Sequence, residues 1–422
     1  MSPDTPQHEV LVVGGGPAGA AAGYWLAEAG RDVVVVERKI FPRDKTCGDG
    51  LTPRAVRQLG DMGLEHVLAG AHHRTEGLRA LGHGMTLELP WPSHPDLPSH
   101  GYVVRRRDLD QLVAENAVKS GATMHQGTDV LSPTYDRGIL TGATVEDRET
   151  GRTRDITAKY VVVADGANSR FGRALGTTRD KAWPQGMAIR GYYESPRHDD
   201  PFIESALDVR DRNGASMPGY GWIFPLGDGM VNVGIGLVST FRDWKSVNTS
   251  HLMDEWVATA PESWGISAAT KRGEPTGGRL PMGASVGPRW GPGWLAVGDA
   301  AGSINPFNGE GIEYGYETGR LAAQVIDEAL ATGDGLALGR YDKELEAEFG
   351  LYFKTGRTFM RLLGHPALMR ELTKVGMHSY SLMEWALRIM SNSLRPDELG
   401  PAEAAYKVVA QLARAIPEPT SR

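Results

Sequence analysis

The chain has a single cysteine, Cys47, among its 422 residues. One cysteine excludes a disulfide within the chain, so we expect a reducing, cytoplasmic environment. No stretch of about 20 consecutive apolar residues occurs, and the sequence therefore predicts no segment that spans a bilayer. The polar start Met1–Glu9 also lacks the apolar core of a signal peptide.

An excess of basic charge is also missing. The chain has 45 Lys and Arg against 52 Asp and Glu, which gives a net charge of −7. This balance argues against a nucleic-acid partner. The apolar share of 41% and the charged share of 23% are typical of a folded globular protein, and the length allows two or three domains. We expect no metal site.

Two runs of valine and leucine, Val10–Val13 and Val33–Val36, organise the first part of the chain. Apolar runs of this length are typical of parallel strands that are buried on both faces. Between them lie a glycine-rich turn and a stretch of small residues that ends at Gly30. The order strand, turn, helix, strand predicts a dinucleotide-binding βαβ unit.

Each residue of the turn has a physical role in this unit. Gly14 permits the tight turn, Gly16 lets the backbone approach a pyrophosphate, and Gly19 allows close packing of helix and sheet. Pro17 suits the first helical turn, whose free N–H groups face the phosphates. Glu37 ends the second strand, where a carboxylate accepts hydrogen bonds from an adenosine ribose and repels a 2′-phosphate. FAD or NAD is therefore favoured over NADP in this site.

The rest of the chain is predicted to contain helices and strands and then, towards its end, helices alone. We expect helices at Leu51–Leu68, Arg106–Ser120 and Gly311–Ala331, and a helical region from Leu338 onwards. The strands that we expect are Leu78–Trp91 (more than one), Thr123–Val130, Leu140–Val145, Tyr160–Ala164, Met187–Glu194, Ala206–Arg210, Tyr220–Pro225, Met230–Leu237 and Trp294–Val297.

Three separated motifs together resemble the FAD-dependent oxidoreductases of the aromatic-hydroxylase fold. They are the glycine turn with Glu37, the sequence Asp165-Gly166-Ala-Asn-Ser169, and the sequence Gly298-Asp299-Ala-Ala-Gly302. A fourth stretch, Arg106-x-x-Leu109-Asp110-x-x-Val113, has valine where this fold usually has leucine. The resemblance implies an α/β fold with a Rossmann-type FAD-binding domain, an antiparallel β-sheet substrate domain and a C-terminal helical region.

This resemblance also implies domain bounds and a cofactor site. We expect the FAD-binding domain at residues 1–75, 102–180 and 286–337, the substrate domain at 76–101 and 181–285, and the helical region at 338–422. The residues that we expect at FAD are Gly14, Gly16, Pro17, Ala18, Gly19, Glu37, Arg38, Cys47, Gly48, Arg106, Asp165, Gly166, Asp299, Pro306, Gly309, Gly311 and Ile312. Asp165 has an alternative interpretation as a turn residue alone.

Within this fold, Pro42–Gly50, Gly219–Pro225 and Asn305–Gly311 resemble the geranylgeranyl reductase family, and in particular the menaquinone reductases, which saturate one isoprene unit of a quinone tail. The resemblance implies a reductase of a C=C bond in an isoprenoid quinone or prenyl lipid. A geranylgeranyl diphosphate or geranylgeranyl-lipid reductase is the alternative. NAD(P)H or a separate electron carrier supplies the electrons.

Cys47, Tyr220 and Trp222 are the catalytic candidates. An isolated alkene has no carbonyl to polarise it, so a proton must arrive with the hydride. Cys47 is a candidate proton donor or positioning group, and its alternative role is that of a small packed side chain. Tyr220 and Trp222, with Tyr192 and Phe224, either line an isoprenoid pocket or belong to the core of the second sheet.

The C-terminal helices carry basic residues among apolar ones. This pattern suits a peripheral contact with the inner face of a membrane, and it equally suits a helical cap on the FAD-binding domain. The basic residues are Lys354, Arg357, Arg361, Arg370 and Lys374, and the apolar ones are Phe353, Phe359, Leu362, Leu363, Leu368 and Leu372.

Two rival functions stay open at this point. An aromatic hydroxylase or halogenase has the same fold, although the tryptophan pair typical of halogenases is incomplete, since Tyr220 precedes Trp222 by two positions. A prenyl-binding escort protein without catalysis shares the architecture, but the retention of all three FAD motifs argues against it.

Overall fold

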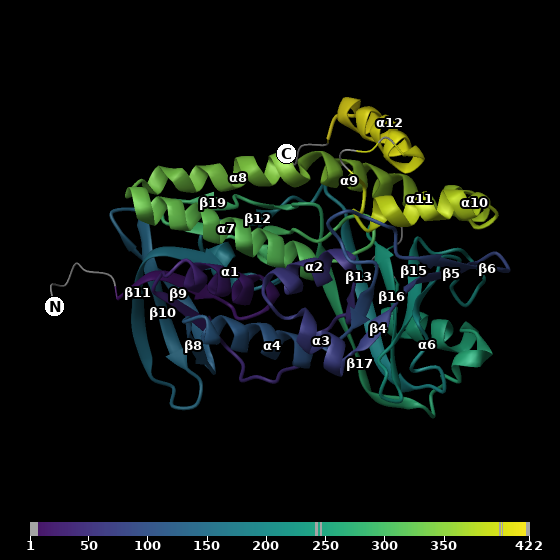
Figure 1. Cartoon of the computed structure of the whole chain (residues 1–422), viewed down its shortest axis with the longest axis horizontal. Coiled ribbons are helices and arrows are strands. Elements are labelled where there is room, and N and C mark those ends of the chain that lie inside the picture. Colours follow the sequence, from purple (N-terminus) through teal and green to yellow (C-terminus); the bar gives the residue numbers. More distant parts are fainter. Residues whose placement is uncertain (1–6, 241–243, 245–246, 396–397, 399, 419–422) are drawn as a thin grey trace.

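The computed structural model describes residues 7–240, 244, 247–395, 398 and 400–418, so most of the polar start Met1–Glu9 lies outside it. An eight-stranded sheet forms the left half of the molecule in Figure 1. Its main path runs β19 (Trp290–Gly291), β20 (Trp294–Ala296), β11 (Thr153–Val163), β1 (His8–Val13), β2 (Val33–Glu37) and β8 (Thr123–Gln126). The strands β9 (Thr128–Asp136) and β10 (Ile139–Asp147) extend from β11 as an antiparallel hairpin.

The central strands are parallel and buried on both faces, as the two apolar runs predict. Val10 pairs with Val33 and Tyr160, and the register continues to Val13. Val10, Val12, Val33 and Val35 face a core shared with helices, whereas Leu11, Val13, Val34 and Val36 face a core shared with β10 and β11.

Small residues let two helices pack tightly on this sheet. Helix α1 (Pro17–Glu28) lies against α7 (Ile312–Thr332), and α4 (Arg106–Lys119) flanks α1 (Figure 1). A Cβ atom at Gly319 would lie 2.5 Å from the carbonyl oxygen of Ala18. Glycine at this position therefore permits the close approach of the two helices.

A seven-stranded sheet forms the right half of the molecule (Figure 1). Its order is β17 (Lys271–Pro281), β13 (Gln185–Glu194), β16 (Met230–Val238), β15 (Gly219–Pro225), β14 (Phe202–Ala206), β5 (Gly77–Gly82) and β6 (Met85–Pro90). All neighbours pair antiparallel except β14 and β5. Leu252, Met253 and Trp256 of α6 (Thr249–Thr259) join the apolar core of this sheet. The mostly antiparallel second sheet is as predicted.

Three sequence predictions are wrong in detail. The strand expected at Thr123–Val130 is parts of two strands, β8 and β9, which are separated at Gly127 with its left-handed φ of 66°. The helix expected at Leu51–Leu68 is two helices, α2 (Pro53–Asp61) and α3 (Glu65–Ala71), because Gly63 between them adopts a left-handed φ of 75°. The strand expected at Ala206–Arg210 lies earlier, at Phe202–Ala206, where it pairs with β5 and β15. Short elements complete this part of the fold: β3 (Gly50–Leu51), β4 (His73–Thr75), β7 (Gly101–Val103), α5 (Arg170–Ala174), β12 (Thr178–Arg179) and β18 (Val286–Gly287).

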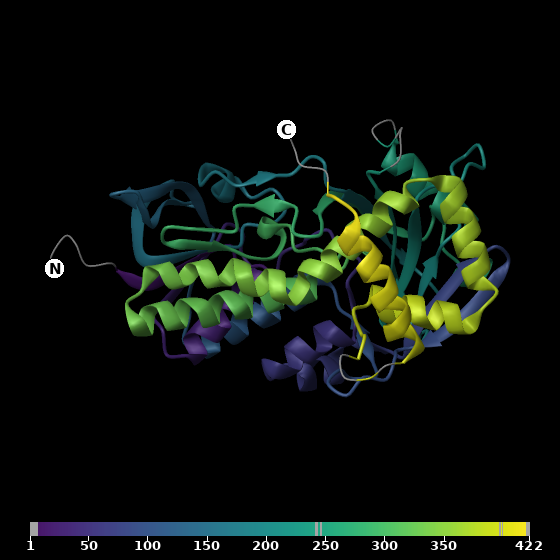
Figure 2. The same cartoon turned by 90° about the horizontal axis from the view of Figure 1, so that it is seen from above.

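The chain after α7 is helical, as predicted, and covers the top of the molecule in Figure 1. Figure 2 shows α7 running beside one long helical stretch, which is followed by separate helices that turn away from it. The helices are α8 (Gly339–Leu345), the π-helical turn η5 (Glu346–Gly350), α9 (Leu351–Leu363), α10 (Pro366–Met377), α11 (Tyr380–Met390) and α12 (Pro401–Ala415). Among the described residues, no helix is long and apolar enough to cross a membrane. We propose the domain bounds given above as the division of the chain.

Candidate active site

The glycine turn after β1 has a conformation that requires glycine at two positions. Gly14 has a φ of 105°, and its N–H donates to the carbonyl oxygen of Val36 at 2.8 Å. A Cβ atom at Gly14 would lie 2.4 Å from the Ala164 carbonyl oxygen, and one at Gly19 would lie 1.9 Å from the Gly14 carbonyl oxygen. Both neighbours are backbone, so neither position accepts a side chain.

The N-terminus of α1 is open to an anionic ligand. Gly16 is its N-cap and Pro17 its first residue, and within the described chain no side chain caps the helix. A Cβ atom at Gly16 would have one neighbour within 4 Å, the Nη2 atom of Arg43 at 3.6 Å. Free N–H groups, a helix dipole and a nearby guanidinium fit the pyrophosphate of a dinucleotide. Ala18 lies in this first turn, and its side chain is buried toward α7.

Glu37 ends β2 with its carboxylate turned toward the glycine turn. It accepts from the backbone N–H of Gly15 at 2.9 Å and from that of Lys39 at 3.0 Å, and it is 5% exposed. Oε2 also accepts from Arg43 Nη2 at 3.5 Å, whereas Oε1 keeps a second lone pair, which leaves capacity for a ribose hydroxyl. Arg38 is exposed directly after the strand, and its contact with the cofactor stays a prediction.

Arg43 is a residue that the sequence interpretation missed. Its guanidinium lies between two buried carboxylates, with Nε 3.4 Å from Glu37 and Nη1 2.9 Å from Asp110. Arg106 binds the same Asp110 side chain in a bidentate pair at 2.6 and 2.8 Å. Arg106 is therefore occupied by Asp110, and its contact with FAD stays a prediction. The only signal for Arg43 was its place in the quoted stretch Pro42–Gly50.

The Asp165-Gly166 motif has a clear local role. One carboxylate oxygen of Asp165 accepts from the Phe171 N–H at 2.9 Å, and the other accepts from the Ser169 hydroxyl. Asp165 thereby fixes the start of α5, as the alternative interpretation holds. Gly166 follows with a φ of 81°. A further contact of this turn with the cofactor stays a prediction.

Asp299 and the loop before α7 meet, although they come from separate motifs. Asp299 follows β20 in a 3-10 turn, and a Cβ atom at Gly311 would lie 3.5 Å from its Oδ1 atom. Gly309 has a φ of 84°, and Gly311 is the N-cap of α7. The Asp299 carboxylate and the N-terminus of α7 therefore lie side by side, and the contact of this pair with the flavin stays a prediction.

Two further predicted residues of this loop point into the protein. Ile312 is buried with Leu51 and Ala55 in an apolar core. Pro306 packs against α9, where a Cβ atom at Gly356 would lie 2.4 Å from its ring. Only the backbone atoms of Ile312 and Pro306 remain candidates for a contact with the cofactor, and this contact stays a prediction.

Several side chains of the second sheet fasten the Cys47 loop, residues 42–50, and Asn232 makes two of these bonds. Nδ2 of Asn232 on β16 donates to the Cys47 carbonyl oxygen at 2.9 Å and to Asp49 Oδ2 at 2.8 Å. Its Oδ1 atom accepts from Trp222 Nε1 at 2.9 Å. Asn232 is fully buried, and Arg190 adds a second donor to the Cys47 carbonyl oxygen at 3.2 Å.

Asp49 is the buried centre of this network. It is 0% exposed and accepts from the Tyr192 hydroxyl at 2.6 Å and from the Arg106 N–H at 3.2 Å. Burial raises the pKa of Asp49, while the hydrogen bonds from Tyr192 and Asn232 oppose this rise. The sequence offered one signal for Asn232, since it is the polar exception in the apolar strand Met230–Val238.

The three catalytic candidates come together at this junction. Tyr220, Trp222 and Phe224 alternate on β15 and share one face, with ring centroids 5.9 and 6.2 Å apart. A Cβ atom at Gly48 would lie 3.4 Å from Trp222 Nε1. The Tyr220 hydroxyl donates to the carbonyl oxygen of Asn308, in the loop before α7. The aromatic row therefore faces both the Cys47 loop and the loop of Gly309.

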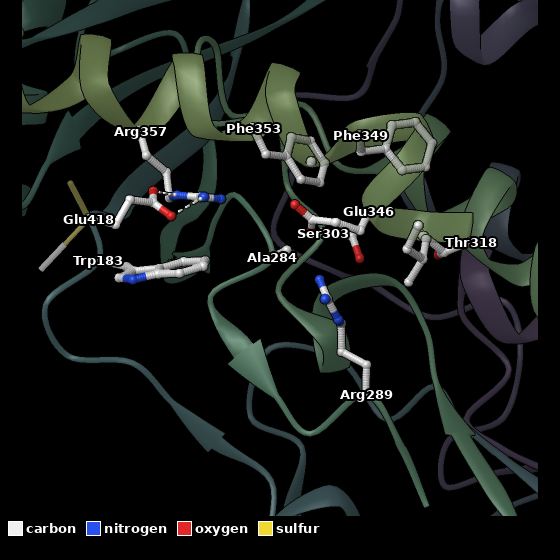
Figure 3. Close-up of a pocket in the computed structure, with 12 residues that line it drawn as sticks. Trp183, Ala284, Arg289, Ser303, Thr318, Glu346, Phe349, Phe353, Arg357 and Glu418 are labelled. Carbon is white, nitrogen blue, oxygen red and sulfur yellow. Dashed lines mark hydrogen bonds and ion pairs between the residues drawn. The ribbon is translucent and has the colours of Figure 1, made fainter. Parts of the chain in front are cut away.

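A separate cavity of about 140 Å³ lies beneath α8 and α9. Figure 3 shows Arg357 paired with Glu418 above the Trp183 ring, and Arg289 pointing toward Ser303 and Glu346. None of the cofactor or catalytic candidates named above is among the described residues that line it. This cavity is therefore distinct from the candidate active site.

Comparisons with known proteins agree with this geometry. Residues 7–347 match the FAD binding domain family. The menaquinone reductase of Mycolicibacterium smegmatis is 42% identical over 393 residues, which cover 92% of this chain and 93% of that protein. Digeranylgeranylglycerophospholipid reductase 2 of Methanopyrus kandleri is 31% identical over 360 residues, with 82% and 84% covered.

A solved structure from Thermoplasma acidophilum, described as geranylgeranyl bacteriochlorophyll reductase-like, has the same fold. Its TM-score is 0.77 at 22% identity, and the match covers 95% of this chain and 99% of that one. The predicted fold class and cofactor are thus confirmed. The chain belongs to the FAD binding domain family of FAD-dependent oxidoreductases.

Proposed function

We propose that this chain is an FAD-dependent reductase that saturates one C=C bond of an isoprenoid chain, with the side chain of menaquinone as its substrate. The observation that carries the proposal is the junction of the Cys47 loop with the aromatic row of β15, fastened by Asn232. The 42% identity with a menaquinone reductase over nearly the whole chain supports this substrate.

FAD, when bound, supplies the hydride for this reaction. The chain's own residues bind and orient it. The open N-terminus of α1 and Arg43 attract the phosphates, Glu37 accepts from the ribose, and Asp299 with the N-terminus of α7 holds the flavin end.

The aromatic row gives the substrate an apolar contact surface. An isoprene unit has no polar handle, so its recognition depends on burial, at about 25 cal/mol per Å² of apolar surface. Tyr220 and Phe224 keep part of their surface exposed, whereas Trp222, which lies between them in the row, is 5% exposed.

Cys47 is the candidate proton donor of this site. Its thiol is half-buried, and its carbonyl oxygen, rather than its sulfur, fastens the loop. The Arg106 side chain hydrogen bonds to the Cys47 side chain, and the proton to be transferred is that of the thiol itself. A small packed side chain is the alternative role, and substitution separates the two.

A geranylgeranyl-lipid reductase is the second candidate function. The 31% identity with a digeranylgeranylglycerophospholipid reductase favours it. Both functions use the same chemistry and differ in the head group attached to the isoprenoid. The electrons come from NAD(P)H or from a separate carrier.

We also propose that the chain contacts the inner face of a membrane through α10. Leu368, Leu372 and Val375 are exposed on this helix beside the exposed basic residues Arg370 and Lys374. Other members of the predicted basic and apolar set have structural roles instead. Arg357 and Phe353 are buried, and Lys354 donates to the Arg414 carbonyl oxygen. Flotation with anionic liposomes at low and high salt tests this contact, and failure to float at either salt concentration overturns it.

The experiment that tests the proposed reaction uses the purified flavoprotein without oxygen. The flavin is reduced chemically, and menaquinone or a geranylgeranyl lipid is added while flavin absorbance is followed. We expect reoxidation with menaquinone, and a product heavier by one H₂ in its side chain. Reoxidation with the geranylgeranyl lipid alone favours the second function, and reoxidation with neither overturns both.

A further inference from the structure

Two glutamate side chains meet beside the candidate active site without a cation of their own. Glu310 lies in the loop before α7, and Glu313 lies in the first turn of that helix. Glu313 is 2% exposed, whereas Glu310 keeps part of its surface open. The two carboxyl groups hydrogen bond to each other. Since two carboxylates offer only acceptors, this bond requires that one of them carry a proton.

The surroundings of Glu313 favour the protonated form. Its Oε1 atom is buried and has no hydrogen-bond donor among the residues that the structure describes. Arg54 of α2 acts electrostatically on Glu310, but its Nε lies 2.8 Å from Glu317 and its Nη2 donates to the same carboxylate at 3.1 Å. Arg54 is therefore already occupied by Glu317 and does not neutralise Glu313.

The electrostatics agree with this geometry. Burial raises the pKa of Glu313, and the neighbouring Glu310 carboxyl raises it further. Burial also raises the pKa of Glu310, against the lowering effect of its hydrogen bonds. The other titratable or charged groups that interact with the pair come from α2, α7 and α9, and from β15: Arg54, Tyr314, Tyr316, Glu317, Tyr352 and Tyr220.

The pair adjoins the residues that face the substrate. The Tyr220 hydroxyl donates to the Asn308 carbonyl oxygen, and a Cβ atom at Gly309 would lie 3.9 Å from that hydroxyl. Both Glu310 and Cys47 act electrostatically on Tyr220. Tyr220 is therefore within electrostatic reach of both the carboxyl pair and the candidate proton donor.

We propose that Glu310 and Glu313 share one proton and return it to the active-site donor after each turnover. This proposal rests on the proposed function, because saturation of a C=C bond adds one hydride and one proton. The donor gives its proton to the alkene carbon that does not receive the hydride. It then regains a proton from the pair, and water reprotonates the pair through the partly exposed Glu310.

The first test needs no substrate. Infrared spectra of the purified flavoprotein with ¹³C-labelled glutamate report protonated carboxyl groups at neutral pH. We expect a protonated glutamate band in the parent protein and its loss in Glu313→Gln. A parent spectrum in which every glutamate is ionised overturns the proposal, whatever the enzyme reduces.

The pH dependence of stability gives a second readout. When a glutamate has a higher pKa in the folded state than in the unfolded state, the folded state binds more protons. The protein then loses unfolding free energy as pH rises from the unfolded-state pKa to the folded-state pKa. Glutamine mimics the protonated carboxyl group and does not titrate, so the variant does not lose this part of its stability as pH rises. From about pH 5 to about pH 8, Glu313→Gln should therefore gain in melting temperature relative to the parent. The exposed control Glu371→Gln should not, and an equal pH dependence of parent and Glu313→Gln contradicts the proposal.

The functional test uses the double variant Glu310→Gln, Glu313→Gln. With FAD bound, its steady-state rate of alkene saturation should fall by about tenfold, since no carboxyl proton remains to return. Glu371→Gln should retain the parent rate. If the double variant does not fold, Glu310→Gln alone takes its place, and its rate should also fall because Glu310 is the member of the pair through which water returns the proton. A parent rate with normal FAD content in either variant overturns the role in turnover.

Discussion

Nδ2 of Asn232 lies 2.9 Å from the carbonyl oxygen of Cys47, a residue 185 positions earlier in the chain. This bond joins a loop that follows the dinucleotide-binding unit to the middle of the second sheet. It places the only thiol of the chain beside the aromatic row of β15. The candidate active site is therefore a junction between two sheets, and one buried amide makes three of the hydrogen bonds that hold it.

Asn232→Ala should destabilise the protein strongly. The change removes three hydrogen bonds and leaves the Trp222 N–H without its acceptor. Buried groups that lose their partners cost about 1–3 kcal/mol each, so we expect a loss of about 2–4 kcal/mol in urea denaturation. The matched control is Asn116→Ala, which removes one hydrogen bond from the Asn116 side-chain amide to the Met62 carbonyl oxygen. This variant should lose about 1 kcal/mol of unfolding free energy. Equal losses in the two variants contradict the central role of Asn232.

Two glycines of β16 should respond differently to alanine. A Cβ atom at Gly234 would lie 2.1 Å from the Trp222 ring, whereas one at Gly236 would lie 3.7 Å from it. Gly234→Ala should therefore displace Trp222 and cost about 1–3 kcal/mol. Gly236→Ala, two residues further along the same strand, should change stability little. Tryptophan fluorescence and denaturation measure both effects, and a tolerated Gly234→Ala would show that Trp222 is not held as described.

Gly16→Ala should reduce FAD binding without unfolding the protein. The added methyl group enters open space at the start of α1, beside Arg43, where the phosphates are expected. The free energy of unfolding of the FAD-free protein should fall by no more than about 1 kcal/mol. The ratio of flavin to protein after purification measures the loss. Gly70→Ala, also in open space but on α3, is the control and should keep a full complement of FAD. Full flavin content in Gly16→Ala would place the phosphates elsewhere.

Cys47→Ala should separate the two roles of this residue. The carbonyl oxygen that fastens the loop is unchanged, so we expect normal stability and normal FAD content. Loss of a general acid typically costs about 10²-fold in rate, and the rate of alkene saturation should fall by that order. Thr46→Ala at the neighbouring position should keep the parent rate. A parent rate in Cys47→Ala would make the thiol a packed side chain and would leave the proton to another group.

Local patterns were enough to predict the dinucleotide-binding unit. The glycine turn, the valine strands and Glu37 lie within 30 residues, and each has a backbone role that the sequence dictates. The break at Gly63 was missed because an isolated glycine inside a helical pattern is often tolerated. The strand at Phe202–Ala206 was misplaced because its position is set by its partners β5 and β15 and not by its own periodicity.

The candidate site was only partly predictable. Cys47, Tyr220 and Trp222 were singled out by family resemblance, but nothing local to them reveals that Asn232 holds them together. Arg43 and Asp49 were missed for the same reason, since their partners lie in other elements. A buried polar residue in an apolar strand, such as Asn232, was the signal available, because such a residue needs partners.

The most direct test of the proposed reaction is mass spectrometry of the quinones in cells that differ only in this chain. Cells that express it should contain menaquinone heavier by one H₂ in the side chain, and cells that lack it should contain only the unsaturated form. Cys47→Ala should give an intermediate or absent shift at equal protein level. Identical menaquinone masses with and without the chain would contradict the account.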